Sequence, residues 1–312
     1  MLTIGSALGI ALLVLLSIPW YRSVRSRRSI PYPPGPPGHF LFGNLRQMPS
    51  RSTHQWLTFT EWGRKYGPLT YLNISGRPIL VINTQEAAVD LLEKRAVIYS
   101  DRSRVVMAEL SGWGEATAML RLGPKHRLRR KLLAQALHPR LVQRDYVPIQ
   151  ERIARKFSQS LLDSPANYYN HIHRLMGETA QVIAYGECSD GDIDLVELGR
   201  ENMRNTGKLL AGYAVDFFPW LAYLPDWFPG TQFKQDAKSM KAVMQKTRRL
   251  PFEMVKKKMA SGTAPPSFVL TALEGQKDGL ISDVDGEVIS YAALTIYGGK
   301  YGSWRPQNDY IQ

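Results

Sequence analysis

The stretch Pro31-Tyr-Pro-Pro-Gly-Pro-Pro-Gly38 holds five prolines in eight positions. Proline fixes the backbone φ angle and removes a hydrogen-bond donor, so this stretch can form neither a helix nor a central strand. The composition predicts a stiff, extended spacer. Considered by itself, it is also compatible with an ordinary proline-rich linker.

The segment before this spacer has the pattern of a membrane anchor. Residues 2–19 include no charged side chain, and Trp20 and Tyr21 follow at the place of an interfacial aromatic pair. About 17 to 20 apolar residues suffice to cross a bilayer. Four arginines come next, and positive charge after an apolar run predicts that the following chain stays in the cytoplasm; they are Arg22, Arg25, Arg27 and Arg28.

We therefore expect residues 1–21 to form a transmembrane signal-anchor and residues 22–38 to form a basic, Pro/Gly-rich hinge. The rival interpretation is a cleaved signal peptide. It is disfavoured because no basic residue precedes the apolar run and no small-x-small cleavage site follows it.

Composition narrows the class of protein. The 312 residues include 40 Lys and Arg against 27 Asp and Glu, a net charge of +13, which favours contact with phospholipid, nucleic acid or an acidic protein. A nucleic-acid binder is disfavoured because four of the surplus charges are the anchor arginines and no nucleic-acid motif is present.

A single cysteine excludes a disulfide framework and a Cys-based zinc site. We predict no metal site elsewhere, since His171 and His173 would point to different sides of a helix.

The body that follows the hinge is predicted to be mainly α-helical with a small β-sheet. Residues 52–66 have helical spacing that Gly67-Pro68 ends. Two β-rich runs are then joined by Ser75-Gly76, and Thr84 is placed to cap a helix over residues 85–94. Residues 100–122 look irregular, and from Lys125 onward the pattern is helical in blocks that prolines interrupt.

In this order, the apolar anchor, the arginine cluster and the PPGPPG hinge resemble the start of a microsomal cytochrome P450. Later segments resemble the same family: residues 66–72 and 78–83 its first two strands, and residues 215–221 and 224–230 a region between two helices of fungal members. The resemblance implies that residues 39–299 are the N-terminal part of a haem-thiolate monooxygenase domain. The expected fold is then the N-terminal portion of the P450 fold behind a single transmembrane anchor.

The helix expected over residues 125–137 includes the candidate cofactor-binding residues. Arg130 shares a face with His126, and an arginine on a mostly apolar face needs an anion to offset its desolvation. In the resembled family a Trp and an Arg four residues apart bind a haem propionate from this helix. Arg130 takes the Arg place and His126 stands where Trp is usual. The alternative is a solvated basic helix. In both cases Arg129 is expected on the outer surface, facing an acidic electron-donor protein or the solvent.

The catalytic groups of the resembled family are missing. Its thiolate ligand lies in a Phe-x-x-Gly-x-x-x-Cys-x-Gly segment, whereas Cys188, the only cysteine, has Gln181, Ala184 and Asp190 at the corresponding places. The helix pattern that begins near Gly286 stops at Gly299, before the family's acid–alcohol pair. Residues 300–312 are a polar tail unrelated to the family. We therefore predict no catalytic residues and a truncated, inactive chain.

Two explanations of this break stay open. Gly299-Lys300-Tyr301 can be encoded as GGT-AAG-TAT, which includes the common intron start GTAAGT, so the tail can be a translated intron. The rival is a real truncated isoform.

By resemblance, the function is a membrane-bound haem-thiolate monooxygenase of the endoplasmic reticulum, single-pass, with its body in the cytoplasm. It would oxidise a small apolar organic substrate with O₂, using haem and NADPH-derived electrons from a reductase. Its partners would be that reductase and membrane lipid, the latter also through the aromatic residues between Phe217 and Phe228. The alternative is a non-catalytic, membrane-tethered fragment that binds a partner protein.

Overall fold

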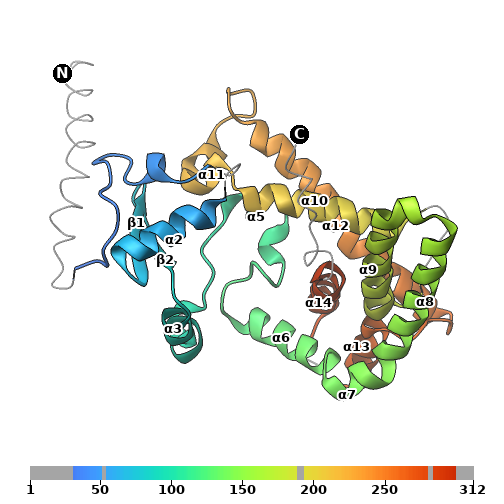
Figure 1. The fold of residues 1–312 in the computed structure, drawn as a ribbon. Coiled ribbons are helices and arrows are strands. Elements are labelled where there is room, and N and C mark those ends of the chain that lie inside the picture. The colour runs from blue at the N-terminus through green and yellow to red at the C-terminus, as the bar shows by residue number, and fades with distance from the viewer. Residues whose placement is uncertain (1–30, 51–53, 188–192, 280–283, 300–312) are drawn as a thin grey trace. The chain divides into compact units, whose positions relative to one another are not determined.

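The structure is a computed structural model that describes residues 31–50, 54–187, 193–279 and 284–299. The expected anchor with its arginines, Cys188 and the tail from Lys300 lie outside these ranges. Among the residues described, no helix combines the length and the hydropathy that a bilayer crossing requires. The chain divides into two compact units, Met1–Lys94 and Arg95–Gln312, which are described separately (Figure 1). Across the described residues the chain is mainly helical with one small sheet, which lies in the first unit, and this agrees with the predicted class.

The first unit is built on an antiparallel hairpin. Strand β1 (Leu69–Ile74) pairs with β2 (Arg77–Ile82), with Leu69 opposite Ile82. The turn between them uses positive φ angles at Ser75 (49°) and Gly76 (86°), the left-handed region that glycine enters without strain. The other elements are η1 (Leu45–Gln47), α2 (Gln55–Tyr66), α3 (Gln85–Ala88) and the π-helical turn η2 (Val89–Lys94).

Local signals set the end of α2 and the beginning of α3 as predicted, whereas the helix expected over residues 85–94 is α-helical only to Ala88 and continues as the π-helical turn η2. Helix α2 ends at Gly67, whose φ of 102° suits glycine, and Pro68 follows. The Thr84 hydroxyl accepts a hydrogen bond from the backbone N–H of Ala87 at 3.3 Å, so Thr84 caps α3.

The described part of the hinge is extended, as predicted, but it is more than a spacer. The backbone N–H of Tyr71 in β1 donates to the carbonyl oxygen of Pro34 at 2.9 Å, and the Tyr32 ring stacks on the Tyr71 ring at 4.4 Å. A Cβ at Gly35 would lie 1.9 Å from the Tyr71 carbonyl oxygen. The hinge glycine therefore allows the close approach that ties residues 31–38 to the sheet.

Buried Asn44 strengthens the same junction. Its Nδ2 donates to the Pro36 carbonyl oxygen and its Oδ1 accepts from the backbone N–H of Asn73, both at 2.8 Å. One side chain thus links the hinge to β1, and it satisfies polar groups that would otherwise be costly to bury.

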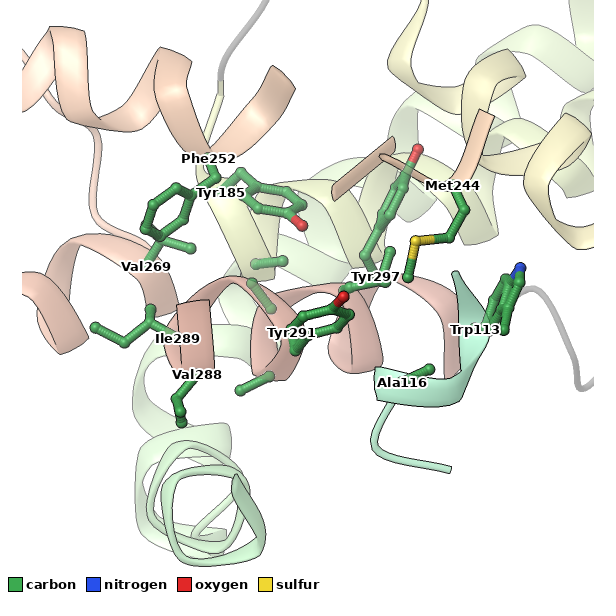
Figure 2. Close-up of a cluster of buried hydrophobic side chains, with 14 of the residues drawn as sticks. Trp113, Ala116, Tyr185, Met244, Phe252, Val269, Val288, Ile289, Tyr291 and Tyr297 are labelled. Atoms are coloured by element: carbon green, nitrogen blue, oxygen red, sulfur yellow. The ribbon is translucent and has the colours of Figure 1, made fainter. Parts of the chain in front are cut away.

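The second unit packs its helices around α14. This helix contacts α6, α9, α12 and α13, and Ile289, Ala292 and Ala293 are completely buried (Figure 2). Helix α14 begins at Gly286, as predicted, and is described as far as Gly299. The remaining elements are α4 (Ala96–Tyr99), α5 (Val106–Leu110), η3 (Trp113–Glu115), α6 (Pro124–Ala136), α7 (Pro139–Leu141), η4 (Val142–Tyr146), α8 (Val147–Asp163), η5 (Pro165–Asn167), α9 (Tyr168–Tyr185), α10 (Leu195–Ala211), α11 (Ala214–Phe217), η6 (Pro219–Tyr223), α12 (Gln232–Ala260) and α13 (Phe268–Lys277).

The segment predicted to be irregular, residues 100–122, includes two short helices, α5 and η3. The first turn of α5 is held by a distant residue: the carboxylate of buried Asp216 in α11 accepts from the backbone N–H of Met107 at 2.8 Å. Its other oxygen accepts from the backbone N–H of Tyr213. Asp216 therefore caps α5 from 109 residues away.

Candidate functional site

Helix α6 positions the basic residues that the sequence singled out. It begins after Gly123, with Pro124 in the first turn, where a missing N–H costs nothing. Leu132 and Ala136 are buried and define its inner face.

Arg129 lies on that inner face, so the prediction that it is on the outer surface is wrong. Only 1% of its side chain is exposed. The physical reason is the helical period: Arg129 precedes Leu132 by three residues and Ala136 by seven, which places all three on one stripe. The same arithmetic, applied to the sequence, would have indicated its burial.

Three groups compensate the buried charge of Arg129. Its guanidinium lies over the Tyr291 ring of α14, 4.4 Å from the centroid. Its Nη2 is 3.6 Å from a carboxylate oxygen of Glu115, and its Nη1 donates to the Glu115 carbonyl oxygen. Burial lowers the pKa of Arg129, and the negative charge of Glu115 acts in the opposite direction.

His126 and Arg130 lie one helical turn apart on α6, as the spacing requires. Arg130 is exposed and His126 is half-buried. Burial lowers the pKa of the His126 imidazole, and the neighbouring positive charges of Arg130, Arg102 and Arg129 lower it further. In the described ranges Arg130 has neither an ion pair nor a side-chain hydrogen bond, so this edge of α6 carries positive charge that no carboxylate neutralises.

A second arginine, Arg248 of α12, was not singled out by the sequence analysis. Its guanidinium also lies over the Tyr291 ring, at 4.5 Å, and its Nη1 donates to the Ser290 hydroxyl at 2.7 Å. Its buried Nε has no hydrogen-bond partner among the described residues. The signal that could have found Arg248 is its position four residues after buried Met244 on α12.

His126, Arg248 and Tyr291 line a cavity of about 670 Å³. The cavity lies between residues 103–115, the first turn of α6, α12 and Tyr291 of α14. Its volume is typical of a site for a small organic molecule. Apolar and cationic side chains share its lining; the apolar ones include Val105, Ala108, Met119, Leu120 and Met244, and the cationic ones include Lys241 and Arg248, beside His126.

A helical unit centred on α14, joined to a hairpin unit with a proline-rich entry, is the architecture that the resemblance implied. The family model of cytochrome P450 matches residues 33–299. The chain belongs to the cytochrome P450 family.

Curated fungal relatives support the same assignment. The chain is 34% identical over 281 residues to cytochrome P450 monooxygenase 98 of Postia placenta, covering 88% of this chain and 53% of the relative. It is 33% identical to cytochrome P450 monooxygenase claR of Ampulloclitocybe clavipes, covering 94% and 53%. It is also 33% identical to tryptamine 4-monooxygenase of Psilocybe cyanescens, covering 88% and 54%. The chain spans about half the length of the curated relatives it matches.

The described residues fit only one edge of the haem that this family implies. The unneutralised positive charge of Arg130, with the imidazole of His126 one turn away as a hydrogen-bond donor, suits the carboxylates of haem propionates. The axial ligand of the family is a cysteine thiolate, and the only cysteine of the 312 residues, Cys188, lies outside the described ranges and lacks the family's flanking residues.

Proposed function

We propose that this chain is the N-terminal part of a membrane-bound haem-thiolate monooxygenase. Such an enzyme inserts one oxygen atom from O₂ into a small apolar substrate, with NADPH-derived electrons from a reductase. A thiolate-ligated haem supplies the O–O cleaving chemistry when it is bound. The observation that carries the proposal is the family match across residues 33–299.

In this proposal His126 and Arg130 bind a haem propionate. An exposed guanidinium with no carboxylate partner is available for a charge-assisted, bidentate hydrogen bond to a carboxylate. The imidazole of His126 can donate to the same group. Its lowered pKa keeps it neutral near pH 7, so it contributes a hydrogen bond rather than a charge.

The 312 residues alone do not perform the oxygenation, because they include neither the thiolate segment nor the acid–alcohol pair. The alternative function is a non-catalytic, membrane-tethered fragment that binds an acidic partner, such as the reductase. It is favoured by the exposed cations on α6 that form no ion pair with any described residue: Arg127, Arg130 and Lys131.

The test of the monooxygenase proposal is to read the DNA beyond codon 299. A splice donor there, followed by exons for an acid–alcohol pair and a Phe-x-x-Gly-x-x-x-Cys-x-Gly segment, supports the proposal. Expression of that joined frame should then give a thiolate-type reduced-CO band, which the 312-residue chain should not give. A coding sequence without such exons within a few kilobases favours the tethered fragment.

The proposed location is the membrane of the endoplasmic reticulum, with a single span at residues 2–19 and the body in the cytosol. A second contact is proposed at the aromatic segment, because Tyr223 and Trp227 are 88% and 80% exposed and aromatic rings favour the interface. Carbonate extraction tests the anchor: the chain should stay with the membranes, and its recovery in the soluble fraction would rule the anchor out.

A further inference from the structure

The cavity beside Tyr291 has both charged and apolar lining residues. Arg248 and the Tyr291 ring meet in this lining, which also includes Lys241 and His126. The other charged lining residues are Arg104, Glu109, Glu115, Arg121 and Lys125, and the apolar ones include Val105, Ala108, Met119, Leu120 and Met244. This mixed lining suits a molecule with one charged group and an apolar body.

The carboxylates around the cavity are already engaged. Glu109 forms a two-point ion pair with Arg104 at 2.8 Å. Glu115 lies 3.6 Å from both Lys125 and Arg129. Each of these two acidic residues therefore neutralises a cation other than Arg248.

Arg248 is left without a counter-charge. Within the described part of the chain it has no ion pair, and its hydrogen bond to Ser290 is to a neutral hydroxyl. The Nε atom of Arg248 is buried and unpartnered. A half-buried guanidinium in this state is poorly compensated, since desolvated charges need an opposite charge or several hydrogen bonds.

A second observation favours an anion rather than a neutral molecule. Two guanidinium groups, of Arg129 and Arg248, lie over the same Tyr291 ring. Of these two residues, Arg129 has a carboxylate partner, Glu115 at 3.6 Å, whereas Arg248 has no carboxylate partner among the described residues. Lys241, exposed at the rim and without an ion pair to any described residue, adds a further positive charge to the entrance.

Gly112 lines the cavity beside α12. Its φ of 77° lies in the left-handed region, which glycine adopts without strain. A Cβ there would make ordinary contacts, 3.4 Å from Cγ of Lys241 and 3.8 Å from Sδ of Met244, so the loop passes close to α12.

We propose that this cavity binds an organic monocarboxylate with an apolar body, and that Arg248 is the residue that selects the carboxylate. The assignment of this ligand as the substrate rests on the proposed monooxygenase function, whereas the binding itself needs no haem. The carboxylate accepts from the guanidinium of Arg248, and the body lies along Val105, Met119 and Met244.

The experiment is a calorimetric titration of the 312-residue chain, in detergent micelles without haem. The probes are 4-phenylbutyrate and its neutral amide, 4-phenylbutyramide. We expect saturable binding of the acid, about tenfold or more tighter than the amide, as for loss of a charge-assisted hydrogen bond. Equal binding of the two probes, or no saturable binding of the acid, would overturn the proposal.

Variants test whether Arg248 is the side chain that selects the carboxylate. Arg248→Gln should weaken binding of the acid about tenfold and leave the amide within about twofold. Arg249→Gln removes the same charge from the next, exposed position of α12 and should leave both affinities unchanged. If Arg248→Gln loses helicity by circular dichroism, Lys241→Gln at the rim replaces it, with an expected weakening of the acid of about threefold. Equal effects at positions 248 and 249, or an unchanged acid affinity in Lys241→Gln, contradict the assignment.

A competition experiment tests whether the cavity binds a free carboxylate or a propionate group of haem. Haemin and haemin dimethyl ester are each tested as competitors of 4-phenylbutyrate. Haemin should displace no more 4-phenylbutyrate than its dimethyl ester does, because the proposal places the carboxylate on Arg248 and the propionate on His126 and Arg130. Displacement by haemin but not by its ester would show that the cavity holds propionates, which would overturn the proposal. Because no arm depends on turnover, these results stand independently of the test of the monooxygenase function.

Discussion

Arg129 shows how a charged side chain can be almost completely removed from water. Its compensation comes from one aromatic ring, one carboxylate 3.6 Å away and one carbonyl oxygen. Buried ion pairs of this kind contribute little net stability, because desolvation offsets the Coulombic attraction. The methylene groups of the Arg129 side chain, whose guanidinium lies over Tyr291, contribute to stability through packing.

Arg129→Met should therefore change the free energy of unfolding by less than about 1 kcal/mol, since methionine keeps most of the packing and removes the desolvated charge. Arg129→Ala should lower it by about 3 kcal/mol, because it leaves a cavity against α14. Urea denaturation followed by circular dichroism measures both. If methionine costs as much as alanine, the charge itself stabilises α6 and this account is wrong.

His126 provides a pH-dependent test. Burial and the charge of Arg130 lower the pKa of His126 in the folded chain. The unfolded chain therefore binds more protons than the folded chain at pH values between the lower folded pKa and the unfolded pKa near 6.5. Stability should be fully present above about pH 6.5 and should fall as the pH falls through this window. His126→Gln should make denaturation midpoints less dependent on pH between about 5 and 7. The exposed His54→Gln variant should keep the wild-type slope, and an unchanged slope in His126→Gln would contradict the interpretation.

The spacing of His126 and Arg130 could be predicted from the sequence because it depends only on the helical period. The burial of Arg129 and the partial burial of Arg248 were not predicted. The charge of each arginine was considered before its position in the helical period. Both arginines lie on the stripe of buried neighbours, Leu132 in one helix and Met244 in the other. The pairing of both with Tyr291 could not be predicted, since it needs three helices placed in space.

At the scale of elements, some helices and strands depend on local sequence signals, and others depend on contacts between residues that are far apart in the chain. The capped helix α3, the hairpin and α14 were predicted because Thr84, Ser75-Gly76 and the apolar period are encoded where they act. Helix α5 was missed because its capping group belongs to Asp216, 109 residues later. The docking of the hinge on β1 was missed for the same reason.

Asp216→Ala should destabilise the second unit by about 1 to 2 kcal/mol, because it leaves the buried N–H groups of Met107 and Tyr213 unsatisfied. Asp216→Asn keeps one carbonyl acceptor and should cost about half as much. Hydrogen exchange at the Met107 amide reports the local effect, which should exceed that at α8. Equal exchange in the alanine variant and the parent chain would show that α5 does not depend on this cap.

Gly35→Ala should release the hinge from the sheet, since the added Cβ would lie 1.9 Å from the Tyr71 carbonyl oxygen. Limited proteolysis should then cleave residues 31–38 faster, and the Tyr71 amide should exchange faster. Gly123→Ala is the control, because its backbone is extended and the nearest atom lies 4.0 Å away. Unchanged protection of Tyr71 in the Gly35 variant would mean that the hinge does not dock.

At the scale of the whole chain, large apolar side chains are exposed in several segments. Beyond the aromatic residues of 220–228, the short helix α4 exposes Val97, Ile98 and Tyr99, the first two at 93% and 70%. Adjacent exposed apolar side chains of this kind mark a surface that another body covers. The described residues include no element that covers them.

We therefore expect the 312-residue chain, once purified in detergent, to self-associate through α4 and to bind a hydrophobic dye strongly. The double variant Val97→Thr, Ile98→Gln should lower both, measured by sedimentation velocity and dye fluorescence, with little change in helicity because neither side chain contributes to the core. Leu162→Gln removes a single exposed leucine from α8 and is the matched control, since an isolated apolar residue on a surface drives little association. If the control lowers self-association as much as the double variant, the association is general and α4 is not the surface that drives it.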